Sequence, residues 1–249
     1  MLNAVSLLTF LTRSKARFQR IVFRRGKLQA NPWQQTQNNF MMQCFADYKV
    51  QIGGVLHVGG HLGEEYDIYK TVGAKRVAFF EPVPSFFDAM ARNLKGRKDV
   101  ELIRKALGSK NEIRLIYVNK GSGESTSFLE PTTLYEGHFE EKQLPIEVAT
   151  LDSVLPSLID SHVFNLLVTD TQGFDLEVLK GATDTLKQID YVYTEVSKGH
   201  YHNEPELEDF DALLVPLGFR RVSISLYGSW KGSDHWGDVF YIKNGERHL

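Results

Sequence analysis

The sequence predicts an α/β protein in which a doubly wound, mostly parallel seven-stranded sheet follows an N-terminal helical arm. Three observations lead to this fold class. From about residue 50 onward, short apolar segments alternate with segments of helical periodicity. A glycine-rich loop, 59–63, directly follows the first apolar segment. The 249 residues also suffice for one domain of ordinary to large size.

Composition and charge narrow the class further. Hydrophobic residues make up 42% of the chain and charged residues 24%, which is typical of a globular protein that can bury a core. The net charge of −2 gives no reason to expect a nucleic-acid partner. Cys44 is the single cysteine, so no disulfide can form within the chain, and we expect a cytoplasmic protein.

The N-terminal arm differs from the rest of the chain in charge. Residues 1–46 carry seven basic side chains and no acid, whereas residues 47–249 carry 22 basic and 31 acidic ones. Leucine, phenylalanine and isoleucine recur among the arginines at helical spacing, but the apolar run 4–11 is too short to span a bilayer. The arm could pack on its own domain or on a partner subunit of a homo-oligomer. Alternatively, residues 1–27 form a basic amphipathic helix on the inner face of an anionic membrane.

The polar segment 29–40 is interpreted as a linker, so the predicted boundaries are 1–49 for the arm and linker and 50–249 for the domain. In the domain, strands are predicted at 55–58, 76–80 and 100–105, and the helices between them start near Leu62 and Pro84. Gly73 is expected to end the first of these helices. Strand–helix–strand units of these lengths are typical of parallel sheets with right-handed crossovers.

The second half of the domain continues this alternation less regularly. Further elements are predicted as strands at 112–118, 146–150, 164–170 and 191–196, helices at 151–159, from Leu176 and at 207–217, and a closing hairpin of 219–225 with 239–243. Segment 119–128 is a loop rich in glycine and serine. The chain shows no internal repeat and no low-complexity tract.

The glycine loop lies where open α/β sheets bind ligands, beyond the carboxyl end of a strand. A dinucleotide fingerprint starting at Gly59 would need glycine at positions held by His61 and Glu64, and the Lys-Ser/Thr pair of a P-loop is absent. The next strand ends in Glu81, 22 residues after Gly59, where a carboxylate can accept hydrogen bonds from both ribose hydroxyls. A capping role for Glu81 is the alternative. A ribose without pyrophosphate indicates S-adenosyl-L-methionine.

At this point the chain resembles the FkbM-type S-adenosylmethionine-dependent methyltransferases, over roughly residues 50–243. The matching segments are VLHVGGHLGEE (55–65), VAFFEPVPSFFDAM (77–90), KALGS (105–109), ATLDSVL (149–155), LLVTDTQGFDLEVLKGA (166–182), YVYTEVS (191–197) and GFRRV…HWGDVFYIK (218–243). The resemblance implies a Rossmann-like methyltransferase sheet of about seven strands. It also implies methyl transfer to a hydroxyl oxygen, often on a sugar, glycan or related small molecule.

The resemblance also implies which residues bind the cofactor. They are His57, Gly59, Gly60, His61, Gly63, Glu81, Pro82, Ala106, Leu107 and Asp170. Within this set the glycines would line the methionine part, Glu81 would hold the ribose, and Ala106 and Leu107 would lie near the adenine. His57 departs from the pattern, because methyltransferases commonly carry an acid at this position.

Two carboxylates are predicted to do the chemistry. Asp170 ends the central apolar strand and Glu195 lies on the neighbouring one, so both would face the same crevice. Methyl transfer to an alcohol needs orientation and a base, which Asp170 or Glu195 could supply. The structural alternatives are a helix cap for Asp170 and a salt bridge from Glu195 to Lys198. The two carboxylates could instead hold a divalent cation, but the interpretation without a metal is favoured.

Acceptor contacts are predicted for Ser125 in the 119–128 loop and for His200 and His202 after the fifth parallel strand. A zinc site is not expected, because the H-E-x-x-H pattern and cysteine pairs are absent. Two other functions compete with an O-methyltransferase. A non-catalytic methyltransferase-like module in a glycan or lipid assembly would fold without turnover, and a nicotinamide-dependent oxidoreductase would need an intact dinucleotide fingerprint.

Overall fold

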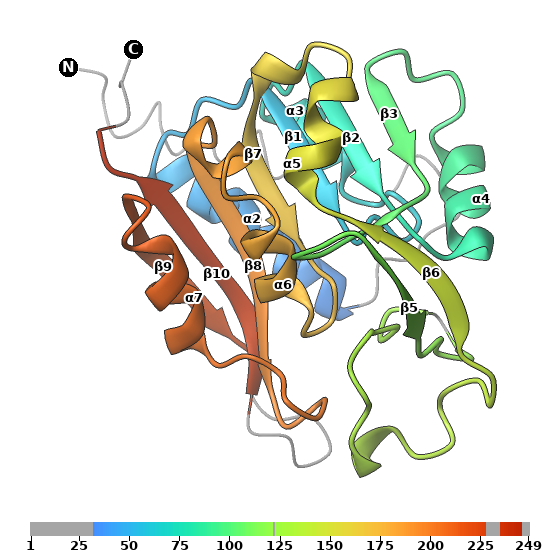
Figure 1. The fold of residues 1–249 in the computed structure, drawn as a ribbon. Helices are drawn as coiled ribbons and strands as arrows, with labels where there is room; N and C mark the ends of the chain where they lie inside the picture. Colours follow the sequence, from blue (N-terminus) through green and yellow to red (C-terminus); the bar gives the residue numbers. More distant parts are fainter. Residues whose placement is uncertain (1–31, 122, 228–234, 246–249) are drawn as a thin grey trace. The chain divides into compact units, whose positions relative to one another are not determined.

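The computed structural model describes residues 32–121, 123–227 and 235–245 (Figure 1). The chain divides into two compact units, residues 1–40 and 41–249. The predicted amphipathic arm, residues 1–27, lies outside the described residues. Across the described part of the chain, no helix combines the length and apolar character needed to cross a membrane.

Helix α2 (Pro32–Asp47) replaces most of the linker predicted at 29–40. Its first residue is a proline, whose fixed φ suits the first helical turn and whose missing N–H has no partner to lose there. Glutamine and methionine, which favour helices, follow in its sequence. Cys44 and Phe45, near the C-terminal end of α2, belong to the second unit and are buried there. The Phe45 ring lies 5.9 Å from that of Phe240.

Seven strands form the main sheet in the order β3-β2-β1-β7-β8-β10-β9. The five parallel strands are β1 (Gly54–Val58), β2 (Arg76–Phe80), β3 (Val100–Ile103), β7 (Phe164–Thr169) and β8 (Tyr191–Lys198). The closing hairpin of β9 (Phe219–Leu226) and β10 (His235–Lys243) is antiparallel. The doubly wound, mostly parallel seven-stranded sheet predicted from the sequence is therefore confirmed.

Helices cover both faces of this sheet, which is why all five residues of β1 are buried. The α-helices after α2 are α3 (Tyr66–Thr71), α4 (Pro84–Asn93), α5 (Leu151–Val154), α6 (Asp175–Lys180) and α7 (Leu207–Leu214). Helices α5, α6 and α7 lie on one face of the sheet, as Figure 1 shows. The main core lies under these helices, and it includes Leu56, Phe80, Leu167 and Val192 from four neighbouring strands.

A smaller sheet is inserted between β3 and β7, in the order β4-β6-β5. Its strands are β4 (Ala106–Leu107), β5 (Glu112–Ile116) and β6 (Leu144–Ala149). Short 3₁₀ turns complete the described elements: η1 (Thr133–Tyr135), η2 (Leu155–Ser157), η3 (Ser161–Val163) and η4 (Thr185–Lys187). The helix predicted at 151–159 is thus shorter, because Pro156 follows its first turn and the chain continues as 3₁₀ helix.

Candidate active site

Most of the predicted site residues lie at or after the carboxyl ends of the parallel strands. From β1 the chain proceeds to β2 and β3 on one side, and β7 and β8 lie on the other side. The strand order therefore reverses between β1 and β7, where open α/β sheets bind their ligands. The loops that follow β1, β2, β7 and β8 all begin at this edge of the sheet.

The loop after β1 is held by backbone hydrogen bonds. The N–H groups of Gly59 and Gly60 both donate to the Phe80 carbonyl, over 3.0 and 2.9 Å. Gly63 N–H donates back to the Gly60 carbonyl at 2.7 Å. These contacts fold the loop over the end of β2 and place it beside Glu81.

Two of the glycines are required by the fold itself. Gly59 has φ of +90°, and a Cβ atom there would lie 1.9 Å from the carbonyl oxygen of Asp170. Gly63 has φ of +75°, and a Cβ atom there would lie 2.8 Å from the Leu94 side chain. Only glycine accepts both the left-handed backbone and these close approaches. Gly59 therefore allows the loop to approach the residue that follows β7, and Gly63 allows it to approach the end of α4, in addition to any approach to a ligand.

The Glu81 side chain accepts a hydrogen bond from this loop. Its Oε2 accepts the His61 backbone N–H at 2.9 Å, and its Oε1 accepts the Val83 N–H at 2.8 Å. The side chain is 5% exposed, and burial raises the pKa of its carboxyl to about 7. Each carboxylate oxygen retains lone-pair capacity for one more donor. This arrangement fits a carboxylate that accepts two neighbouring hydroxyls of a ligand.

His57 is a buried, uncharged part of the same region. Its Nδ1 lies 2.8 Å from the Tyr69 hydroxyl, and burial lowers the pKa of its ring to about 3. The Glu65 carboxyl lies 3.9 Å from the same nitrogen. Burial, with the negative charges of Glu64 and Asp170, raises the pKa of Glu65 to about 8. Sequence reasoning did not select Glu65, although the missing acid at position 57 was a signal to search the loop for another.

The remaining predicted cofactor residues lie around the ends of β2 and β3. His61 has φ of +41°, and its ring lies 5.1 Å from that of Phe86. Pro82 is half-buried directly after Glu81. Ala106 and Leu107 form β4, and their side chains are buried in the core rather than directed at the loop. Any contact from this pair to a ligand would therefore involve the backbone.

Asp170 and Glu195 are joined by a residue that sequence reasoning missed. The Gln172 side-chain amide donates to Asp170 Oδ1 at 2.7 Å and to Glu195 Oε2 at 2.9 Å. Asp170 does not cap α6, whose N-terminal neighbour is Phe174, and Lys198 pairs with Glu206 instead of Glu195. Both structural alternatives considered for these two acids are therefore absent from the described structure.

The pKa values of both carboxyl groups of this pair are raised. Burial raises the pKa of Asp170, whereas the hydrogen bond from Gln172 opposes that rise. Burial and the charge of Asp170 raise the pKa of Glu195 well above its ordinary value.

Within the described ranges, no three His, Cys, Asp or Glu side chains gather closely enough to hold a metal ion.

The predicted acceptor residues separate in the structure. His200 is 7% exposed, and its Nδ1 lies 2.8 Å from the Tyr135 hydroxyl. The Ser125 carbonyl accepts the hydroxyl of Tyr201, which also reaches Gln172. His202 is exposed, and only its backbone N–H is held, by the Glu130 carbonyl. The structure thus brings Ser125 and His200 toward the carboxylates through tyrosines, and it leaves His202 at the surface.

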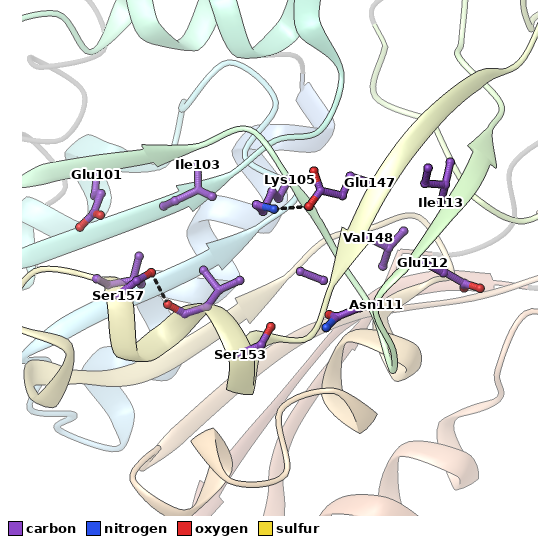
Figure 2. Close-up of a pocket in the computed structure, with 13 residues that line it drawn as sticks. Glu101, Ile103, Lys105, Asn111, Glu112, Ile113, Glu147, Val148, Ser153 and Ser157 are labelled. Carbon is purple, nitrogen blue, oxygen red and sulfur yellow. Dashed lines mark hydrogen bonds and ion pairs between the residues drawn. The ribbon is translucent and has the colours of Figure 1, made fainter.

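A separate groove lies along β3, β6 and α5 (Figure 2). Glu101, Ile103 and Lys105 line one side of it, and Ser153 and Ser157 line another. Lys105 forms an ion pair with Glu147 there. None of the residues predicted for the site lines this groove, so it is distinct from the carboxylate pair.

Comparisons with known proteins agree with this geometry. The family model described as methyltransferase FkbM domain matches residues 57–221. Comparison with curated sequences finds no match. Among solved structures, magnesium protoporphyrin IX methyltransferase (ChlM) of Synechocystis PCC 6803 with bound SAM has a TM-score of 0.51 and 11% identity, over 91% of this chain and 90% of that one. N-methyltransferase NodS of Bradyrhizobium japonicum WM9 has a TM-score of 0.52 and 8% identity, over 87% and 99%. These two likenesses show the fold.

Proposed function

The chain belongs to the FkbM methyltransferase domain family, and from this premise we propose that it methylates a hydroxyl oxygen of a sugar, glycan or related small molecule. The observation that carries the proposal is the carboxylate pair of Asp170 and Glu195, which Gln172 bridges beside the glycine loop. A base at this place suits an acceptor that must lose a proton, as an alcohol does.

S-adenosyl-L-methionine is the methyl donor, and the solved structure of ChlM contains it. When bound, it supplies an electrophilic methyl group on a positively charged sulfur. Glu81 fits the ribose, because each of its oxygens accepts one backbone N–H and has capacity for one hydroxyl. The neighbouring N–H and carboxylate groups can therefore bind the cofactor without any phosphate site.

Glu65 is proposed to take the place of the acid that is absent from position 57. His57 is uncharged, so it cannot neutralise the amino group of the methionine part. The Glu65 carboxyl lies beside it and belongs to the loop that the family resemblance assigns to this part. A positive charge near Glu65 would favour its ionised form and lower its raised pKa.

Asp170 is proposed as the general base. Its carbonyl oxygen packs on Gly59, so its place relative to the cofactor loop is fixed by the backbone. Its Oδ1 is held by Gln172, and its raised pKa makes the carboxylate a better proton acceptor than an ordinary aspartate. Asp170 would orient the acceptor hydroxyl and receive its proton as the new carbon–oxygen bond forms and the methyl–sulfur bond breaks, with S-adenosylhomocysteine as the leaving group.

The test is the substitution Asp170→Asn in the full chain. We expect methyl transfer from labelled S-adenosylmethionine to a panel of sugars and polyols to fall by about 10²-fold or more, the usual loss for a general base. The matched control is Asp88→Asn on the exposed side of α4, which should retain the rate. Binding of S-adenosylhomocysteine, measured by calorimetry, should survive both changes.

Three outcomes would contradict the proposal. An unchanged rate in Asp170→Asn would remove this residue from the mechanism. Cofactor binding without transfer to any hydroxyl in the panel, when amine acceptors are methylated, would replace oxygen by nitrogen as the target. Cofactor binding without any turnover would favour a non-catalytic module.

A further inference from the structure

The side chain of Gln172 lies between Asp170 and Glu195 of the candidate site, and it is not among the site residues predicted from the sequence. We propose that Gln172 is a positioning residue, which holds the carboxyl groups of Asp170 and Glu195 together so that they act on the acceptor as a pair. This inference rests on the proposed function, because it names a further residue of the same site.

The first argument is the geometry of the amide. Both contacts of its nitrogen, at 2.7 Å to Asp170 and 2.9 Å to Glu195, are within ordinary hydrogen-bond length. An amide nitrogen carries two hydrogens, so each carboxyl group can receive one. The amide thereby links a residue after β7 to a residue within β8.

The second argument is the orientation of the amide, whose nitrogen faces both carboxyl groups and whose oxygen faces Tyr201. The Tyr201 hydroxyl approaches the Gln172 Oε1 at 3.3 Å and also donates to the Ser125 carbonyl at 2.9 Å. A flipped amide would direct its oxygen at two carboxylate oxygens, which are acceptors. Tyr201, which is 4% exposed, therefore closes the side of Gln172 that faces away from the pair.

The third argument is the backbone. Gln172 has a φ of +56°, a backbone conformation that residues other than glycine rarely adopt. Gly173 follows with a φ of +87°. The buried Ser127 hydroxyl donates to the Gln172 carbonyl at 2.7 Å, and Thr171 N–H donates to Asp175 Oδ1 at 3.0 Å. A strained residue fixed from several sides is a feature of functional sites. A role limited to the turn would favour glycine here.

The chemical consequence concerns the proton of the pair. Two buried carboxylates repel each other when both are charged, and a donor shared by both reduces that repulsion. Other titratable groups interact with the pair: His61, Glu65, Tyr69, Glu124, Tyr135, Asp175, Tyr201 and Asp238. Among these only His61 lowers the pKa of Asp170, apart from the carboxyl partner itself, so the amide donor has no equivalent replacement in that set.

The experiment follows the carboxyl groups by ¹³C NMR in the full chain labelled at aspartate and glutamate. Asp170→Asn and Glu195→Gln assign the two signals. Gln172→Asn tolerates the left-handed backbone but is one methylene too short to bridge the pair. Because a lost donor disfavours the charged form, we expect the titration midpoint of Asp170 to rise by about one pH unit. Activity should fall about tenfold, with affinity for S-adenosylhomocysteine unchanged.

Controls separate this role from a structural one. Gln172→Gly removes the amide and relieves the backbone, so it should shift the midpoint like Gln172→Asn, without loss of thermal stability. Gln172→Glu keeps the shape of the side chain, and it replaces Gln172→Asn in the experiment if that variant does not fold. It should raise the titration midpoint of Asp170 further, because an acceptor replaces the donor.

An unchanged midpoint in the folded variants would overturn the inference, whatever happens to the melting temperature. Absence of S-adenosylhomocysteine binding by the unsubstituted chain would instead overturn the proposed function. The two failures are therefore distinguishable.

Discussion

Two neighbouring loops form the candidate site, and they differ in whether backbone or side-chain groups determine their role. Residues 59–65 follow β1 and residues 170–174 follow β7, whose last residues, Val58 and Thr169, pair in the sheet. Both loops need a left-handed backbone, at Gly59 and Gly63 in the first and at Gln172 and Gly173 in the second. Each loop turns sharply at the end of its strand, so both face the same edge of the sheet.

The difference lies in what each loop presents. The first is held by backbone N–H groups on Phe80 and Glu81, and at Gly59 and Gly63 it requires the absence of a side chain. The second presents side chains, with Gln172 between two carboxyl groups. A cofactor of constant structure can be recognised by backbone geometry, whereas an acceptor that must lose a proton needs titratable groups.

The largest expected effect comes from closing the space between the loops. Gly59→Ala would put a Cβ atom 1.9 Å from the Asp170 carbonyl oxygen. We expect a loss of unfolding free energy of more than about 4 kcal/mol, because backbone rather than a side chain must move. Chemical denaturation measures this loss.

Gly73→Ala is the matched control. Gly73 has a similar φ of +94°, but no atom lies within 4 Å of an added Cβ. That substitution should cost only about 1–2 kcal/mol, the penalty for a left-handed non-glycine residue. Equal losses at the two positions would show that strain, and not contact between the loops, explains the glycine.

An intermediate effect concerns the buried acid that directly follows the second loop, at the start of α6. Burial raises the pKa of Asp175 to about 7 from 3.8, so its contribution to stability is present below about pH 4 and is lost as pH rises through 7. Asp175→Asn cannot ionise and keeps an acceptor for Thr171 N–H. We expect it to gain about 1–3 kcal/mol of unfolding free energy at pH 8 and almost none at pH 4.

Asp152, outside the site, should show the opposite sign. It accepts four hydrogen bonds, from the N–H and hydroxyl of Thr185, the Asp184 N–H and the Thr183 hydroxyl, and these lower its pKa. Its contribution is therefore present above the unfolded value of 3.8 and is lost as pH falls. Asp152→Asn should cost about 1–2 kcal/mol at pH 8. The same sign for both variants would refute the distinction between site and scaffold carboxylates.

The smallest expected effect separates two adjacent acids of the first loop. Glu65→Gln should weaken S-adenosylmethionine binding about tenfold, because it removes the proposed partner of the amino group. Glu64→Gln is the control, since Glu64 bonds to the Leu62 N–H and pairs with His61 in its own loop. Calorimetry compares the two variants, and equal affinities would leave the amino group without the partner proposed here.

Much of the first loop could be predicted from the sequence. Glycine spacing after an apolar strand and an acid at the end of the next strand are local signals, and strand alternation placed them at one edge of the sheet. The role of Gln172 could not be read in this way. It depends on Glu195, 23 residues away, and on Tyr201. Only the folded chain brings these two residues close to Gln172. Its local signal was a glutamine before glycine in DTQGFD, two residues after a strand-end acid.

Helix α2 shows a second limit. Residues 32–40 are polar and lack a clear apolar stripe, so periodicity indicated a linker. Proline at the first position and helix-favouring residues after it were the available signals. They carry less weight than periodicity, which explains why the helix was missed.

The most direct test of the account is a calorimetric titration of the full chain with S-adenosylhomocysteine, beside Glu81→Gln and with NAD as the control ligand. We predict micromolar binding to the unsubstituted chain, at least tenfold weaker binding to Glu81→Gln, and no binding of NAD. Absence of S-adenosylhomocysteine binding by the folded chain, or comparable binding of NAD, would contradict the assignment of this loop and Glu81 to the methyl donor.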